Sequence, residues 1–170
     1  MHLSKSAGYA IHALSCIEKV GCQPRFIRDI AKCTGLKQPY LAKIINQLAH
    51  DGLVLAKRGY RGGITLARPP ETISLLQIVK ATEGEAWLGF CLFGLDVCPA
   101  QHACPAHEPW TRMRKQIETL LDKTTLADVI QAARTRKAAL AEGPATRKGS
   151  GRKGRNPTVL CPACGGSVVE

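Results

Sequence analysis

The stretch between Cys91 and His107 concentrates side chains that bind metals. It reads CLFGLDVCPAQHACPAH and places three cysteines and two histidines in 17 positions, without the apolar spacing of a helix or a strand. Thiolates and imidazoles are ligands of zinc and of iron–sulfur clusters, and pairs of thiols also form disulfides. The chemistries open to this loop are therefore a disulfide knot, a zinc site or an iron–sulfur cluster.

The spacing of these ligands is Cys91-x6-Cys98-x5-Cys104-x2-His107. Structural zinc sites more often show two close C-x2–4-C or H-x3–5-H pairs, whereas single, wide spacing suits a group larger than one ion. Histidine also replaces cysteine in some iron–sulfur centres and raises their reduction potential. Spacing alone leaves zinc and an iron–sulfur cluster about equally favoured, with His102 as a reserve ligand.

A second thiol pair, Cys161-x-x-Cys164 followed by two glycines, has the shape of a metal knuckle. It is half a zinc site, so the partner subunit would supply the other half, or the pair stays without metal. Residues 143–157, GPATRKGSGRKGRNP, are basic and lack apolar periodicity. They predict a flexible linker between this pair and the rest of the chain.

The sequence predicts a cytoplasmic protein with no membrane partner. The first 19 residues do not form a signal peptide, and no run approaches ~18 consecutive apolar positions. Glutathione keeps cytoplasmic thiols reduced, which weakens the disulfide interpretation and favours metal ligands or scattered core thiols. Cys16 and Cys33, within or beside expected helices, are interpreted as buried small apolar side chains, and Cys22 as an incidental thiol.

The positive charge of the chain is unevenly distributed. The net charge is +11; residues 1–90 hold 12 basic and 6 acidic side chains, and residues 143–170 hold 5 and 1. Basic excess in the N-terminal half and the tail indicates a polyanionic partner such as DNA or RNA, although a basic surface also serves solubility alone.

Two segments of the N-terminal half predict a helix-turn-helix. A helix over 4–19 comes first, followed by a short helix from Ile27 to Lys32, a tight Thr34-Gly35 turn and a second helix from Gln38 to His50. Apolar residues line one side of the second helix, and polar ones lie on the other. The expected DNA-contacting residues of this recognition helix are Lys37, Gln38, Tyr40 and Lys43.

A basic hairpin is predicted directly after these helices. Val54–Lys57 and Ile64–Ala67 read as short strands, and RGYRGG between them supplies a glycine-rich turn. Arg58 and Arg61 fall in this turn, where a winged helix meets phosphates or the minor groove. The fold class is therefore mainly α with a small β-wing.

The predicted organisation has four parts: a winged helix-turn-helix over 1–84, a cysteine-rich loop over 85–108, helices over 109–142 and a basic tail over 143–170. The helix over 108–123 has Trp110, Met113, Ile117, Leu120 and Leu121 along one side. This stripe packs either on the chain's own core or on a partner's copy of the same helix. Thr125 and Asp128 predict a capping box that opens a last helix.

The chain resembles the Rrf-two family of bacterial winged-helix regulators over about residues 1–135. The resemblance lies in MHLSKSAGYAIHAL, IAKCTGLKQPYLAKIINQLAHDGLV, RGYRGGITLARPPETISLLQIVKATEG, the three-cysteine loop and TTLADV. It implies a homodimeric transcription factor, usually a repressor, on a pseudo-palindromic DNA operator. It also implies a 2Fe–2S cluster, or a 4Fe–4S one, that controls DNA affinity, and a dimer interface near 110–122.

The resemblance places Cys91, Cys98 and Cys104 on the family's cluster cysteines, and His107 on the fourth ligand of one branch. Some relatives take that ligand from the first helix of the other subunit, at a position that is Gly8 here; His12, one turn further on, is the alternative. The expected function is a cluster-dependent regulator that senses redox state, nitric oxide or iron. The alternative is a winged-helix protein with structural zinc, and no catalytic constellation indicates an enzyme.

Overall fold

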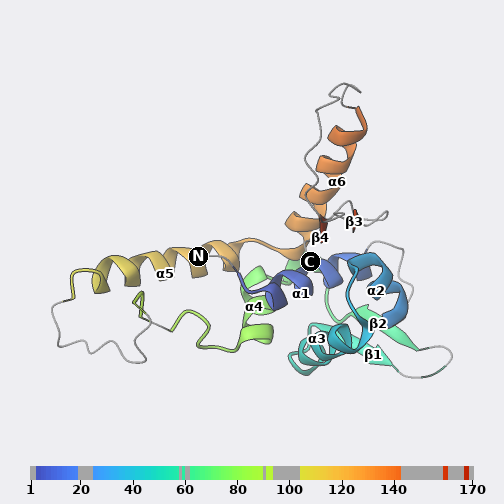
Figure 1. Ribbon diagram of the computed structural model, residues 1–170, viewed down its shortest axis with the longest axis horizontal. Coiled ribbons are helices and arrows are strands. Elements are labelled where there is room, and N and C mark those ends of the chain that lie inside the picture. Colours follow the sequence, from blue (N-terminus) through green and yellow to red (C-terminus); the bar gives the residue numbers. More distant parts are fainter. Residues whose placement is uncertain are drawn as a thin grey trace, which may run out of the picture.

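The computed structural model describes residues 3–18, 25–57, 59, 62–89, 91–93, 104–142, 159–160 and 167–168 (Figure 1). In chain order the elements are α1 (Lys5–Glu18), α2 (Ile27–Thr34), α3 (Gln38–His50), β1 (Val54–Lys57), β2 (Gly63–Leu66), the 3-10 turn η1 (Pro70–Thr72), α4 (Leu75–Glu83), α5 (His107–Lys123), α6 (Leu126–Glu142), β3 (Val159–Leu160) and β4 (Ser167–Val168). The predicted class, mainly helical with a small antiparallel wing, is confirmed.

Helix α1 lies at the centre of the N-terminal part and contacts α2, α3, α4, α6 and β2. Its buried side is built largely from alanines, Ala7, Ala10 and Ala13, together with Leu14 and Ile17. Short side chains allow neighbouring helices to approach closely, so that one helix can serve several partners. The core around it is filled by branched side chains of α2, α3 and α4, among them Ile30, Leu41, Ile44, Leu48, Ile78 and Val79.

The helix-turn-helix is confirmed as α2, a short turn and α3. Gly35 closes α2 in the left-handed conformation (φ 72°), and its N–H donates to the Ala31 carbonyl at 2.8 Å. A residue without Cβ adopts this conformation at little cost, so Gly35 begins the turn. α2 runs two residues beyond the predicted end at Lys32, and Thr34 belongs to the helix and not to the turn.

The wing is an antiparallel pair in which Val54 lies opposite Leu66 and Lys57 opposite Gly63. β2 thus begins one residue before the predicted start at Ile64. Arg25, just before α2, adds an isolated bridge to the sheet: its N–H donates to the Ile64 carbonyl at 2.9 Å, and its carbonyl accepts from the Ile64 N–H at 2.8 Å. These two hydrogen bonds fix the wing to the start of the helix-turn-helix.

Capping boxes open α4 and α6 as their sequences require. Ser74 and Gln77 exchange side-chain and backbone hydrogen bonds at the start of α4. The predicted Thr125–Asp128 pair does the same before α6, where the Asp128 carboxylate accepts from the Thr125 backbone N–H at 2.8 Å and from its hydroxyl at 2.7 Å. These two hydrogen bonds hold the pKa of Asp128 below its usual value.

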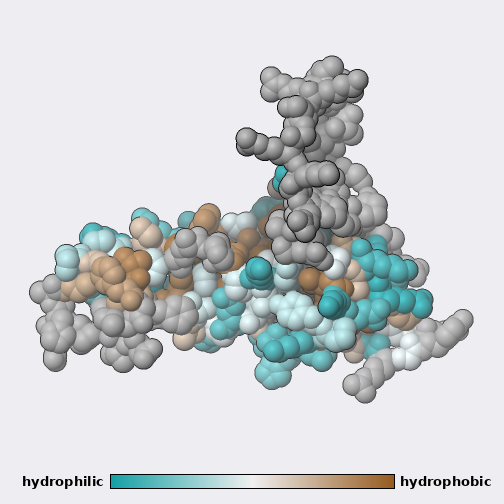
Figure 2. All heavy atoms as spheres, viewed as in Figure 1, coloured by the Kyte–Doolittle hydropathy of each residue, from teal (hydrophilic) through white to brown (hydrophobic). Residues whose placement is uncertain are grey.

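The apolar stripe of α5 is divided between the core and the surface. Leu121 is buried and Ile117 packs partly on the core, whereas Met113 and Leu120 are 52% and 64% exposed. In Figure 1 α5 runs out to one side of the body, opposite the side that holds α2, α3 and the wing, and in Figure 2 brown atoms gather over its outer part. Among the described residues, packing within the chain therefore buries Leu121 and leaves Met113 and Leu120 exposed to solvent.

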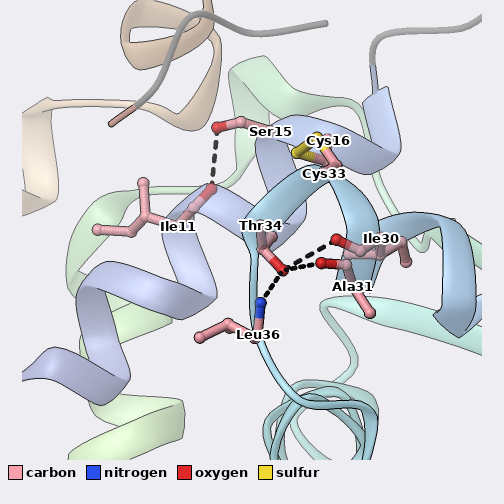
Figure 3. The surroundings of a disulfide bond; sticks show 8 residues. All are labelled: Ile11, Ser15, Cys16, Ile30, Ala31, Cys33, Thr34 and Leu36. Carbon is pink, nitrogen blue, oxygen red and sulfur yellow. Dashed lines mark hydrogen bonds between the residues drawn. A yellow bond between two sulfur atoms is a disulfide. The ribbon is translucent and has the colours of Figure 1, made fainter. Parts of the chain in front are cut away.

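Cys16 and Cys33 differ from the sequence interpretation. Both are buried, as expected, but they are joined by a disulfide between α1 and α2 (Figure 3). Their Cα atoms lie 6.6 Å apart although 17 positions separate them in sequence. The crossing of two helices brings the thiols together, and no local pattern in the sequence encodes that crossing.

The remaining predictions on the C-terminal part fall largely outside the described residues. β3 and β4 form a short antiparallel pair, Val159 opposite Val168 and Leu160 opposite Ser167. Cys161 and Cys164 belong to the segment between these strands, which is not described, and neither is 143–157. No helix within the described residues is both long and apolar enough to cross a membrane.

Candidate nucleic-acid interface and cysteine loop

The solvent side of α3 has the polar side chains expected of a recognition helix. Its opposite side is closed by Leu41, Ile44, Ile45 and Leu48. The four predicted DNA contacts are exposed: Lys37 at the N-cap, then Gln38, Tyr40 and Lys43. The first turn contains no acidic residue, so the positive end of the helix dipole is unopposed there, and Lys37 and Lys43 are both exposed. Such a surface suits a phosphate backbone.

Tyr40 also connects the recognition helix to α1. Its hydroxyl lies 3.0 Å from the Ser6 hydroxyl, and its ring meets the Tyr9 ring edge-on, with the centroids 6.0 Å apart. The side chain remains 38% exposed. Tyr40 is thus held by α1 on one side and open to solvent on the other, and its contact with DNA stays a prediction.

Arg28, in the first turn of α2, is a basic residue that the sequence reasoning missed. Its guanidinium lies 5.1 Å from the centre of the Phe26 ring, and its side chain is 67% exposed. Phe26, Ile27, Arg28 and Gln38 line one surface hollow of about 700 Å³. Arg28 therefore lies beside the start of α3, where the first helix of a helix-turn-helix crosses the DNA backbone.

The wing arginines, Arg58 and Arg61, lie outside the described residues. The structure describes what surrounds them in sequence: Lys57 and Gly63 are paired, Gly59 has φ 107°, and the Gly62 N–H donates to the Gly59 carbonyl at 2.9 Å. The hairpin connection that contains both arginines is therefore closed by glycines, as expected.

The cysteine loop is described at its two ends. Cys91 and Cys104 are half-buried, and the Cys104 carbonyl accepts from the backbone N–H of His107, the first residue of α5, at 3.1 Å. Cys98 lies outside the described residues. Within the described part of the chain, no three His, Cys, Asp or Glu side chains are placed to hold a metal ion.

The segment that leads into this loop is tied to α5. The Arg114 guanidinium donates to the Leu88 carbonyl at 3.1 Å. Trp87 is buried, and its indole Nε1 has no hydrogen-bond partner among the described residues. A buried N–H normally has an acceptor.

The two positions on α1 that bear on the fourth ligand lie one turn apart. Gly8 is exposed, and a Cβ built there would meet no atom within 4 Å. His12 is half-buried. The structure therefore leaves the Gly8 turn of α1 accessible to a second subunit.

The family model of iron-dependent transcriptional regulators named Rrf2 matches residues 3–132 of this chain. The chain belongs to the Rrf2 family. Its winged helix is accordingly the DNA-binding part of a transcriptional regulator, and the prediction of a regulator rather than an enzyme is confirmed.

Named relatives agree with this assignment. The transcriptional repressor NsrR of Streptomyces coelicolor is 31% identical over 134 residues, which cover 78% of this chain and 90% of the relative. The solved structure of T. potens IscR is 28% identical, with a TM-score of 0.62. The match covers 86% of this chain and 94% of the IscR chain. The structure of CymR, the global cysteine regulator of B. subtilis, is 26% identical, with a TM-score of 0.63. The match covers 78% of this chain and 98% of CymR.

Arg61→Ala is expected to weaken the binding of this Rrf2 chain to every DNA sequence alike. A wing arginine that neutralises one phosphate releases about one counterion, so the slope of log affinity against log salt should become shallower by about one unit. Fluorescence anisotropy with specific and unrelated duplexes from low to high salt measures this slope. An unchanged slope and affinity would place Arg61 away from DNA.

Gln38→Ala is expected to change which base is preferred, because side chains at the start of a recognition helix reach base edges. The salt slope should stay that of the wild type, since a neutral amide releases no counterion. The preferred DNA sites of the wild type and of the variant are each selected from a pool of random-sequence duplexes and then compared. Identical preferred sites would show that Gln38 does not read the sequence.

Proposed function

We propose that this chain is a homodimeric transcriptional repressor whose affinity for a pseudo-palindromic operator depends on an iron–sulfur cluster. The observation that supports this most directly is the three-cysteine loop between the winged helix and α5 of an Rrf2 chain. The ligands we assign are Cys91, Cys98, Cys104 and a nitrogen ligand, His107. The cluster is a 2Fe–2S one in this proposal, with 4Fe–4S as the alternative.

The residues present fit such a group. Three thiolates and one imidazole are an iron–sulfur donor set. The described thiols, Cys91 and Cys104, are neither fully buried nor fully exposed, and Cys104 lies just before the N-terminus of α5, where the helix dipole stabilises negative charge. The Nε1 of Trp87, four residues before Cys91, has no partner among the described residues and is a donor that a thiolate or sulfide acceptor would satisfy.

The loop connects to the DNA-binding part through packed elements. When bound, the cluster would supply a redox- and nitric-oxide-sensitive link among the three cysteines. Arg114 and the Leu88 carbonyl fix the loop's entry to α5, α5 contacts α4, and α4 contacts both α1 and α3. An ordered loop would thereby hold α5 at one angle to the winged helix, and a disordered loop would release it. Cluster state then sets the spacing of two recognition helices in a dimer.

The exposed part of α5 is the surface we assign to the dimer. Met113 and Leu120 are apolar and exposed there, beside a surface hollow of about 580 Å³ lined by six residues of α5, Leu120 among them. Arg112, Arg114 and Lys115 outnumber Glu108 in the N-terminal half of α5, and Glu118 and Asp122 outnumber Lys123 in the C-terminal half. An antiparallel pair of α5 helices would place these opposite net charges against each other and bury Met113 and Leu120.

The C-terminal pair Cys161 and Cys164 is proposed as a separate zinc knuckle. The support is the Cys-x-x-Cys-Gly-Gly spacing between two paired strands, β3 and β4, since glycines let backbone amides approach thiolate sulfurs. Zinc content of the chain truncated after residue 142, compared with the full chain, tests this assignment.

Anaerobic purification followed by analysis of iron, sulfide and zinc tests the proposed function. We expect iron and acid-labile sulfide in equal amounts, a visible absorption band, and operator binding that changes when the cluster is removed. Zinc in the loop with no sulfide would instead support a winged-helix protein with a structural metal. Binding that is the same with and without the cluster would exclude sensing.

The fourth ligand has a test of its own. His107→Ala is expected to shift the visible spectrum and lower the iron content under anaerobic conditions, whereas His12→Ala leaves both unchanged, because Cys104-x2-His107 keeps the ligand in the same loop. The two histidines are matched controls for each other. If only His12→Ala perturbs the cluster, the ligand comes from the partner's α1 and our assignment is wrong.

A further inference from the structure

The disulfide between Cys16 and Cys33 lies inside the DNA-binding part of the chain and uses none of the loop cysteines (Figure 3). Cys16 is the third residue from the end of α1, and Cys33 is the second from the end of α2. The two residues are 1% and 8% exposed. The bond therefore joins the central helix to the first helix of the helix-turn-helix.

The residues after Cys33 form the turn that leads into the recognition helix. The buried Thr34 hydroxyl donates to the Ile30 carbonyl at 2.9 Å and accepts from the Leu36 N–H at 3.4 Å (Figure 3). Gly35 then closes α2, and α3 begins at Gln38. A covalent tie at Cys33 holds this turn against α1, next to the point where α3 starts.

We propose that Cys16 and Cys33 form a reversible thiol–disulfide site that sets how firmly the recognition helix is held, independently of Cys91, Cys98 and Cys104. This inference rests on the proposed contact of α3 with DNA, and it does not depend on the presence of a cluster. The oxidised form is the one with the helix-turn-helix fixed to α1. The reduced form keeps the same packing without the covalent tie.

Hydrogen peroxide is the class of oxidant that such buried thiols admit, because it is small and Cys33 has the larger exposure of the two. The Cys33 thiolate attacks one peroxide oxygen, the O–O bond breaks, and the leaving hydroxide takes the thiol proton to become water. The Cys16 sulfur then attacks the sulfenic sulfur of Cys33, and its proton leaves with the hydroxyl group as a second water. Two sulfur electrons pass to one peroxide, and a dithiol reductant reverses the change.

The expected consequence is a tighter operator complex in the oxidised form. A tie at the end of α2 lowers the conformational entropy that α3 loses on binding DNA, in the way that preorganisation strengthens other interfaces. We expect reduction of this bond to weaken operator affinity roughly fivefold. Amide exchange of residues 30–36 should become faster in the reduced form, while that of α6 stays the same.

Mass spectrometry of the full-length chain tests the chemistry. Trypsin places Cys16, Cys22 and Cys33 in separate peptides, 6–19, 20–25 and 33–37, because Lys5, Lys19, Arg25, Lys32 and Lys37 bound them. After treatment with hydrogen peroxide and alkylation, we expect a linked 6–19/33–37 species that disappears with dithiothreitol. Cys22 is the internal control and should remain alkylated. Failure of the linked species to form, or its persistence in dithiothreitol, would overturn the proposal.

DNA binding is measured on the triple variant Cys91→Ser/Cys98→Ser/Cys104→Ser, so that a cluster cannot contribute, with a duplex selected by the oxidised chain from a random pool. We expect the oxidised protein to bind more tightly than the reduced one. Adding Cys16→Ala and Cys33→Ala should give the reduced affinity in both conditions. Equal operator affinity of the oxidised and reduced triple variant would overturn the regulatory role of the Cys16–Cys33 bond. This comparison needs no substitution at Cys16 or Cys33, so it does not depend on how such variants fold.

Discussion

Cys98→Ser is expected to remove the cluster and, with it, the cluster-dependent part of operator affinity. A serine hydroxyl at the middle position of the three-cysteine loop is a much poorer iron ligand than a thiolate, since soft sulfur ligands hold iron–sulfur clusters. Iron and acid-labile sulfide should fall to background, and the visible band should disappear. Operator affinity should change by roughly tenfold or more from that of the cluster-loaded wild type.

Cys22→Ser is the matched control, because it makes the same atomic change in a cysteine outside the loop. It should retain iron, sulfide and DNA binding. Far-UV circular dichroism of both variants separates cluster loss from unfolding. A full cluster in anaerobically purified Cys98→Ser would disprove the ligand assignment for the whole loop.

Most of the fold could be predicted because its signals are local. The recognition helix is an apolar stripe of period 3.6, and the wing is two short strands around a glycine turn. Ser74 and Thr125 are each followed three residues later by the partner that completes a capping box. Each of these elements is specified within about a dozen residues, so tertiary packing did not change the secondary structure that the local sequence favours.

Contacts between distant segments could not be predicted from the sequence. The bridge from Arg25 to Ile64, the Tyr40–Ser6 hydroxyl pair and the Cys16–Cys33 disulfide each join segments whose closeness depends on how helices cross. The expected reducing environment of the cytoplasm even favoured free thiols at Cys16 and Cys33. The exposure of Arg28 beside Gln38 was missed for the same reason, because a lone basic residue in a short helix has no periodic signal.

The site was predictable only as a set of residue types. Three cysteines and a histidine indicated a metal or cluster loop, but spacing did not choose between zinc and iron–sulfur, and the resemblance to a family made that choice. The described ends of the loop show Cys104 just before the predicted α5 helix and a buried Trp87 Nε1 without a partner among the described residues. The burial of Trp87 has no signature in the sequence.

Leu120→Glu is expected to convert the proposed dimer into a monomer. The Leu120 side chain is 64% exposed in the single chain, so a carboxylate there leaves the chain's own core intact. In a symmetric α5 pair the substitution removes an apolar side chain of each protomer from the interface and replaces it with a carboxylate that loses hydration on association. A monomer presents one recognition helix instead of two, so operator affinity should fall by roughly 100-fold or more.

Two variants control this test. Leu120→Met keeps an apolar side chain of similar volume and should remain a dimer. Gln131→Glu adds the same charge to an exposed position of α6 and should also remain a dimer with wild-type DNA binding. Sedimentation velocity at micromolar concentration reports the mass, and titration of a duplex with one or two half-sites reports affinity. The prediction is wrong if Leu120→Glu sediments as a dimer, or if it binds the two-half-site duplex as tightly as the wild type; the second result would mean that α5 does not join the two DNA-binding domains.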